Sequence, residues 1–206
     1  MRTTFTTLSV ALLLAGSGGA FAASSVDLSV KGMITPSACT PGLSNGGLVD
    51  IGKLSAKDLN VDRMTRIKEQ KLQLSVTCDA PTVMALESKD NRAGSEYENR
   101  GNFGLGLING SQKLGSMELS LLSPVADGVP VRTIESYDEG ASWAGNSWLM
   151  PNNLLSVAST TTAAPIAVQL MTADLQISGL IAPTNTLTLD NEVAIDGSVT
   201  LTVKYL

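Results

Sequence analysis

The sequence contains no histidine, and this absence removes several classes of function. Without an imidazole the chain cannot build a Ser-His-Asp catalytic arrangement, and zinc sites with two thiolates and no histidine are rare. The Asp and Glu residues are spread over expected turns, so spacing nominates no acid–base pair. The glycine-rich stretch "FGLGLING" (103–110) alternates like a strand and precedes no helix, unlike a phosphate-binding loop. We therefore expect no enzymatic activity, no metal and no cofactor.

Charged residues and long apolar runs are also scarce. Only 16% of residues are charged and the formal net charge is −5, so the chain is a poor partner for nucleic acid. The acidic turns "DNEVAID" (190–196) and "SYDEG" (136–140) lack the regular oxygen spacing of an EF-hand. Solvated turns are favoured there over weak calcium sites.

The first 22 residues have the pattern of a secretory signal peptide. Arg2 precedes an apolar stretch around Leu8–Leu14, and Ala20-Phe21-Ala22 fits the small-x-small cleavage pattern. The apolar stretch is too short for the alternative, a membrane anchor, and no later stretch approaches about 20 continuous apolar residues. We predict cleavage between Ala22 and Ala23, which leaves residues 23–206 as an exported protein.

The chain has two cysteines, Cys39 and Cys78. In an exported protein a lone pair of cysteines normally forms a disulfide. The alternative is a metal or redox site, but Cys39 has no close cysteine partner and the chain has no histidine to add. A structural disulfide is therefore the favoured interpretation.

Period-two alternation of apolar and polar residues recurs along residues 23–206. It is clear in "SVDLSVKGMI" (25–34), "KLQLSVTC" (71–78) and "GSVTLTVKYL" (197–206), and "NTLTLD" (185–190) and "EVAID" (192–196) share the same pattern. Gly, Asn and Pro turn signals separate these runs. The pattern predicts one all-β domain, a sandwich of antiparallel sheets. The one expected helix is "SAKDLNVDRM" (55–64), with Ser55 as its N-cap.

The stretch "SYDEGASW" (136–143) fits the Asp-box pattern of sialidase-type propellers. Such propellers repeat the box over several blades, and this chain has one copy and too few residues for several blades. A structural turn is therefore favoured. Trp143 and Trp148 could form an exposed sugar-stacking surface, but two tryptophans in a β protein favour the core.

Three landmarks together resemble a known family. "VKGMITPSAC" (30–39) runs through a Lys-Gly pair into the first cysteine, "LQLSVTC" (72–78) ends on the second, and Tyr205 is the penultimate residue. In this order the landmarks resemble fimbrial subunits of the chaperone–usher pathway. "TCDAPT", "FGLG" and "DGSVTLTVKYL" look closer still to the GltF-like branch, whose function is largely undefined.

The resemblance implies an immunoglobulin-like, pilin-type β-sandwich that lacks its last strand. A periplasmic chaperone would lend a strand to the resulting groove, and the N-terminal extension of a neighbouring pilus subunit would replace it at the outer-membrane usher. The protein would then be a structural subunit of a surface fimbria, located in the periplasm and later at the cell surface, with a role in cell adhesion. The groove and chaperone edge would be lined by one face of the last strand: Val199, Leu201, Val203 and Tyr205.

The donor end of the chain departs from the family pattern. The N-terminal extension, residues 23–31, is short, and the residues expected to point inward from the donor strand are Val26, Leu28 and Val30, with no glycine among them. Polymerising pilins usually carry a longer extension. The alternative is a self-contained periplasmic binding or accessory protein, in which residues 26–34 are the first strand of a closed sandwich.

Overall fold

A computed structural model of the protein describes residue 29, residues 38–98 and residues 101–206. The chain divides into the units Met1–Ile34 and Thr35–Leu206, and the first is represented by Ser29 alone. The predicted signal peptide (1–22), its cleavage site at Ala22 and Ala23, and the predicted donor residues Val26, Leu28 and Val30 all lie outside the described residues. All of the described strands and turns belong to the second unit.

The described residues form β-strands, a few 3-10 turns and no α-helix, so the predicted all-β class is confirmed. None of them forms a helix long and apolar enough to cross a membrane. The longer strands are β1 (Cys39–Leu43), β3 (Gln70–Asp90), β7 (Gly115–Ala126), β9 (Arg132–Ser136), β12 (Leu154–Ala158), β13 (Ala167–Ile181) and β14 (Val199–Tyr205). The two-residue strands are β2 (Thr65–Arg66), β4 (Phe103–Gly104), β5 (Leu107–Ile108), β6 (Gln112–Lys113), β8 (Val129–Pro130), β10 (Ala144–Gly145) and β11 (Trp148–Leu149).

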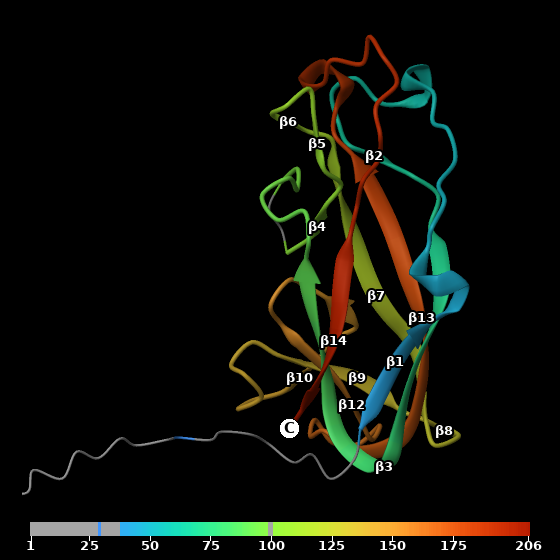
Figure 1. Ribbon diagram of the computed structural model, residues 1–206, viewed down its shortest axis with the longest axis vertical. Helices are drawn as coiled ribbons and strands as arrows, with labels where there is room; N and C mark the ends of the chain where they lie inside the picture. Colours follow the sequence, from blue (N-terminus) through green and yellow to red (C-terminus); the bar gives the residue numbers. More distant parts are fainter. Residues whose placement is uncertain (1–28, 30–37, 99–100) are drawn as a thin grey trace, which may run out of the picture. The chain divides into compact units, whose positions relative to one another are not determined.

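Strand β3 organises the fold, because it bends and takes part in two portions of one curled antiparallel sheet. Its first part pairs with β1 on one side and with β13 on the other, and its last seven residues pair with β14 and β12. Figure 1 shows the bend as a U at the lower end of the molecule. The pairing with β13 shifts register between Val168 and Leu170, opposite the segment of β3 that contains Pro81. Proline cannot donate to a ladder, so a bend with a bulge is a position that tolerates it.

The core lies between the two portions of the sheet. Beyond β13 the first portion continues to β7 and β11, and beyond β12 the second continues to β9 and β10. The predicted alternation in 71–78 is confirmed, because Leu72, Leu74, Val76 and Cys78 are buried while their neighbours are more exposed. After the bend the same strand buries Met84 and Leu86, so both parts of β3 contribute to one apolar cluster.

The helix predicted over 55–64 is wrong. Only a 3-10 turn, η2 (Ala56–Asp58), forms there, and the Ser55 side chain makes no capping hydrogen bond. The carbonyls of Asn60 and Val61 accept hydrogen bonds from the N–H groups of Thr184 and Asn185, in and beside the 3-10 turn η3 (Thr184–Thr186). These long-range backbone bonds replace the bonds that a helix would make within itself.

The strands predicted over 185–190 and 192–196 are also wrong. Residues 187–198 join no ladder with any other described segment, although their alternating apolar side chains pack half-buried against the core: Leu187, Leu189, Val193 and Ile195. A similar segment lies across from it, where Val49 and Ile51 pack against the core from residues 48–54, which are irregular as well. Both segments have the side-chain pattern of a strand without a ladder partner.

Candidate functional site

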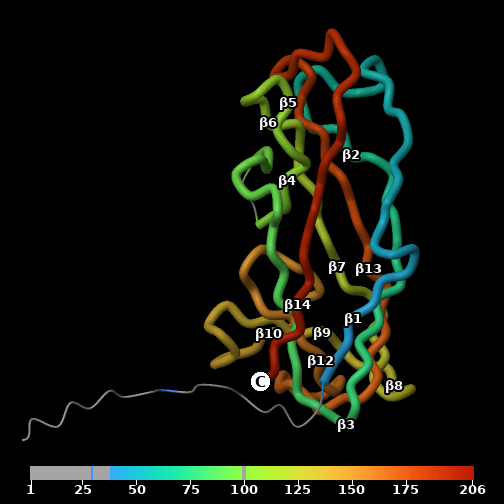
Figure 2. The backbone as a smooth tube through the Cα atoms, in the orientation of Figure 1, coloured from blue at the N-terminus to red at the C-terminus, as the bar shows by residue number. Residues whose placement is uncertain are grey.

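An apolar groove opens between these two irregular segments, over the first portion of the sheet. One wall consists of Leu43 and residues 47–54, and the other runs through residues 189–197 into β14. The floor is apolar and comes from three neighbouring strands: Leu72 from β3, Leu175 and Ile177 from β13, and Met117 and Leu119 from β7. Figure 2 shows the corresponding arrangement of the backbone, with β14 and β1 in front of β7 and β13.

The groove is wider at the end that lies farther from the C-terminus. The section beside Val199 and Leu201 encloses about 250 Å³, and the section between residues 49–59 and 189–195 encloses about 550 Å³. A narrow section of about 90 Å³ adjoins both and shares Val49 and Gly197 with the first of them. An exposed ion pair between Lys53 and Glu192 (2.9 Å) joins the two walls at the wide section.

One edge of β14 has no partner among the described residues. Asn91 N–H donates to the Ser198 carbonyl (3.0 Å) and Leu206 N–H donates to the Val83 carbonyl (3.1 Å). In an antiparallel ladder the direction of the backbone groups alternates along the strand, so the even-numbered residues of β14 face β3. The N–H and C=O groups of Val199, Leu201 and Val203 therefore point to the other edge, beside the groove.

The side chains of β14 alternate with the same period. Val199, Leu201 and Val203 are half-buried and pack against the core, while Thr200, Thr202 and Lys204 are exposed. Lys204 forms an ion pair with Glu87 of β3 (3.2 Å) on the outer face. Val199 and Leu201, two of the four predicted groove residues, line the groove section of about 250 Å³. Their role in binding a partner stays a prediction.

Strand β1 borders the groove on the opposite side. Cys39 and Cys78 form a disulfide in agreement with the prediction, which ties the start of β1 to β3. The backbone N–H of Cys39 donates a hydrogen bond to the hydroxyl of Tyr205 (2.9 Å), so a side chain at the end of β14 reaches across to β1. Tyr205, also a predicted groove residue, does not line the section beside Val199 and Leu201, and it is 43% exposed.

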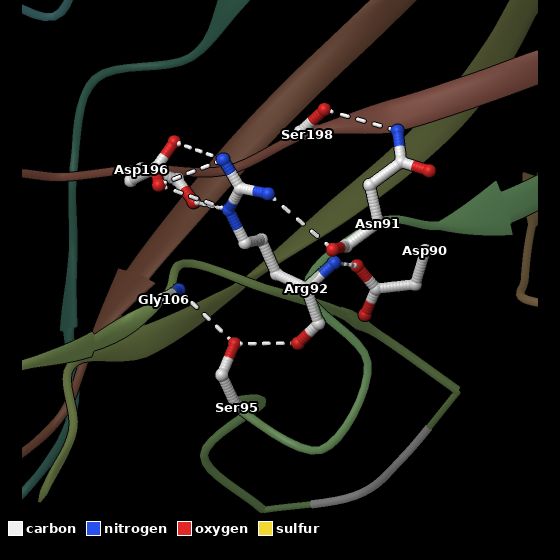
Figure 3. Close-up of polar contacts among 7 residues, drawn as sticks. All are labelled: Asp90, Asn91, Arg92, Ser95, Gly106, Asp196 and Ser198. Atoms are coloured by element: carbon white, nitrogen blue, oxygen red, sulfur yellow. Dashed lines mark hydrogen bonds and ion pairs between the residues drawn. The ribbon is translucent and has the colours of Figure 1, made fainter. Parts of the chain in front are cut away.

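A fork of hydrogen bonds fixes the wall segment just before β14 (Figure 3). The guanidinium of Arg92 donates through Nε and Nη2 to the two carboxylate oxygens of Asp196 (2.9 and 2.8 Å) and through Nε to the Asp196 carbonyl (3.2 Å). These bonds lower the pKa of the Asp196 carboxyl below its usual value. Asn91 Nδ2 donates to Ser198 and Thr200 (3.0 Å each), which extends the attachment into β14. The loop after β3 therefore holds one wall of the groove.

The base of this loop is itself held by a buried carboxylate. Asp90, 8% exposed, accepts hydrogen bonds from the backbone N–H groups of Arg92 (2.7 Å) and Gly104 (2.8 Å). Ser95 Oγ donates to the Arg92 carbonyl (2.7 Å) and accepts from Gly106 N–H (3.0 Å). Backbone donors satisfy the charge of Asp90, so it acts as a structural anchor.

The Asp-box stretch forms a turn that is held by its own aspartate. Asp138 accepts hydrogen bonds from Ser142 and Ser136, and these bonds lower the pKa of its carboxyl to about 2. Trp143 Nε1 donates to the Gly140 carbonyl (3.0 Å) within the turn. The expectation that both tryptophans lie in the core is wrong, because Trp148 is 57% exposed and Trp143 is only half-buried. Trp148 belongs to the short strand β11, so only its neighbour Leu149 points inward.

The sequence analysis did not predict the wall formed by residues 47–54, the floor of the groove or the Arg92–Asp196 fork. The alternation of Val49 and Ile51 in "LVDIGKL" (48–54) is a signal that could have indicated the wall. The alternation of a floor strand is visible in the sequence, but which strands meet to form the floor is not. The fork has no local signal either, because it joins residues 104 positions apart.

Sequence similarity links the chain to one described family and to two proteins of Escherichia coli (strain K12). Residues 28–103 match a family described as "Protein of unknown function (DUF1120)". The chain is 38% identical over 90 residues to "Uncharacterized protein YhcF" of Escherichia coli (strain K12), which covers 42% of this chain and 38% of that protein. It is 28% identical over 246 residues to "Protein GltF" of the same organism, which covers 95% of this chain and 96% of that protein. The chain is therefore similar to Protein GltF over nearly its whole length.

Proposed function

We propose that this protein is a structural subunit of a surface fimbria, assembled by the chaperone–usher pathway through donation of a β-strand. In this proposal the curled sheet is an immunoglobulin-like sandwich that lacks one strand. The chain acts by binding other proteins and not by catalysis, and it serves attachment of the cell to surfaces.

The observation that carries the proposal is the edge of β14 beside an apolar groove, which has no ladder partner among the described residues. The backbone groups of Val199, Leu201 and Val203 point to that edge, and their side chains are only half-buried. An unpaired edge over apolar surface promotes aggregation unless another strand covers it. A strand placed there would gain backbone hydrogen bonds from the edge and bury its alternate side chains in the groove.

The implied partners are set by this mode of binding. A periplasmic fimbrial chaperone would cover the groove first, and a neighbouring pilus subunit would take its place at the outer-membrane usher. The donor segment would be residues 23–31, with Val26, Leu28 and Val30 pointing into the neighbour's groove. Export by the signal peptide at residues 1–22 would bring the chain to the periplasm.

The test compares the oxidised chain refolded alone with the chain refolded together with a strand donor. The chain is diluted out of urea into buffer, or into buffer that contains a peptide of residues 23–31, and the products are separated by size-exclusion chromatography. We expect aggregates in buffer alone and a soluble monomer with bound peptide in the second sample. The same contrast is expected in the periplasm with and without a co-expressed fimbrial chaperone.

A second candidate function is a self-contained periplasmic binding protein. The groove section of about 550 Å³ is its supporting observation, because this volume lies in the range of small-molecule sites. A stable, soluble monomer that forms without any strand donor would favour this second function and reject the first.

A further inference from the structure

The groove-facing edge of β1 offers few hydrogen-bond donors. Asp79 N–H donates to the Ala38 carbonyl (3.0 Å), so Ala38 faces β3, and alternation along the strand directs Cys39, Pro41 and Leu43 toward the groove. Proline has no N–H group. Of these three residues, therefore, only Cys39 and Leu43 present an N–H to the groove.

The Cys39 donor is already occupied by Tyr205. Its N–H points away from β3, in the direction of the position where a strand beside β1 would lie, and the acceptor found there is the Tyr205 hydroxyl at 2.9 Å. That distance is the usual N···O separation of a ladder hydrogen bond. The hydroxyl oxygen thus takes the place that a carbonyl oxygen of a docked strand would otherwise take.

We propose that Tyr205 is a positioning residue that closes one end of the groove and determines where a docked strand stops. A strand in the groove pairs with the free edge of β14 from Val199 to Val203 and ends before it reaches Tyr205. It finds its N–H donors mainly on β14, because proline at position 41 and the occupied Cys39 donor leave Leu43 as the one remaining N–H among these three residues of β1. This inference rests on the proposed function and adds to it the register of the docked strand.

The opposite end of the groove is closed less firmly. There the walls are joined by Lys53 and Glu192, whose side chains are 88% and 78% exposed. Such an exposed ion pair is screened by salt and contributes little free energy to holding the two walls together. A docked strand can therefore extend past the ion pair, whereas at Tyr205 each added hydrogen bond to Cys39 must replace one that already exists.

The experiment uses three synthetic peptides from this chain: residues 25–31, and the same peptide extended by two residues at either end, 23–31 and 25–33. Each carries a fluorophore, and its dissociation constant is measured by anisotropy on the oxidised full-length chain refolded in its presence. Whichever way the peptide runs, one of the two extensions places its added residues at Tyr205. In the wild type this extension should change the dissociation constant less than twofold, because the Cys39 donor there is already occupied. In Tyr205→Phe the same extension should tighten binding about fivefold, the equivalent of one ordinary hydrogen bond.

Two controls accompany the peptide series. Tyr137→Phe removes another exposed tyrosine hydroxyl, which donates to Glu135 (2.9 Å) away from the groove, and should leave all three dissociation constants unchanged. Hydrogen exchange of the Cys39 amide, measured in the complex with the peptide of residues 25–31, should become faster in Tyr205→Phe and not in Tyr137→Phe.

The outcomes separate this inference from the proposed function. If the peptides bind but Tyr205→Phe leaves the dissociation constants of both extended peptides at their wild-type values, the positioning role is refuted and the proposed function stands. An unchanged exchange rate at Cys39 also refutes the positioning role. If no peptide binds to any of the three proteins, the proposed function and the positioning role fall together.

Discussion

Replacing Leu201 with aspartate is the sharpest test of the groove as a binding site. Leu201 lies on the free edge of β14, where its half-buried side chain lines the section of about 250 Å³ together with Leu72 and Leu175. Leu201→Asp places a carboxylate among these apolar side chains. In the uncovered groove water still reaches it, but a docked strand would exclude that water.

The expected loss of affinity can be worked out from this geometry. A fully buried leucine contributes about 1.5–3 kcal/mol, so covering the exposed half of Leu201 is worth roughly 1 kcal/mol. Enclosing an unpaired carboxylate costs at least about 2 kcal/mol more. The total of about 3 kcal/mol corresponds to a dissociation constant more than a hundredfold higher.

The neighbouring Thr200 provides the matched control. It is exposed on the outer face of the sheet, directly opposite Lys89 of β3, and its hydroxyl accepts a hydrogen bond from Asn91. Thr200→Asp adds the same charge one residue away, where a carboxylate can still accept from Asn91 and faces a cation. Its effect should stay within about 0.5 kcal/mol, as for most surface substitutions.

The assay is the anisotropy titration with the labelled peptide of residues 23–31, together with urea unfolding of each variant in an excess of the same unlabelled peptide. Urea unfolding separates loss of binding from loss of the fold. Equal dissociation constants for Leu201→Asp and Thr200→Asp would refute the reasoning, because they would mean that the strand docks elsewhere or that β14 pairs in another register.

Three further outcomes are expected. Replacing Cys39 and Cys78 with serine removes a cross-link between residues 39 positions apart and should lower the free energy of unfolding by about 4 kcal/mol, measured in urea at the same excess of the 23–31 peptide with the oxidised wild type as reference; a loss below about 1 kcal/mol would contradict this. The Asp138 carboxyl has a folded-state pKa lowered from 3.8 to about 2, so its contribution to the turn is present above pH 3.8 and is lost as the pH falls through about 2. Protection of the Ser142 amide from hydrogen exchange should change over that same pH range, and protection lost already at pH 4 would be inconsistent with the turn. Arg92→Ala removes the fork before β14 and should weaken binding of the same peptide while leaving the disulfide intact, a result that an unchanged titration would exclude.

The alternation rule predicted β-strands well where each strand has neighbours. In β3 and β14 the period of two gave the correct buried and exposed faces, because ladder partners on at least one side hold the backbone extended. The disulfide was predictable from export and from the count of two cysteines. The bend in β3 was not, since it depends on pairing with strands that lie up to about a hundred residues further along the chain.

The same rule failed where a neighbour is missing, and this failure bears on function. Residues 187–196 and 48–54 alternate like strands, yet they join no ladder in the part of the chain that the structure describes. Val49, Ile51, Leu189, Val193 and Ile195 nevertheless remain half-buried at the walls of the groove. Alternation expresses which face a segment would bury, whereas a strand also requires a ladder partner for its backbone. Two segments with the first property and without the second lie beside β14, as expected for the incomplete sheet of the proposed function. Hydrogen exchange offers a direct check, because amides of Ile51 and Val203 should become protected together when a strand docks, and protection at Val203 alone would show that the strand completes β14 without ordering the facing wall.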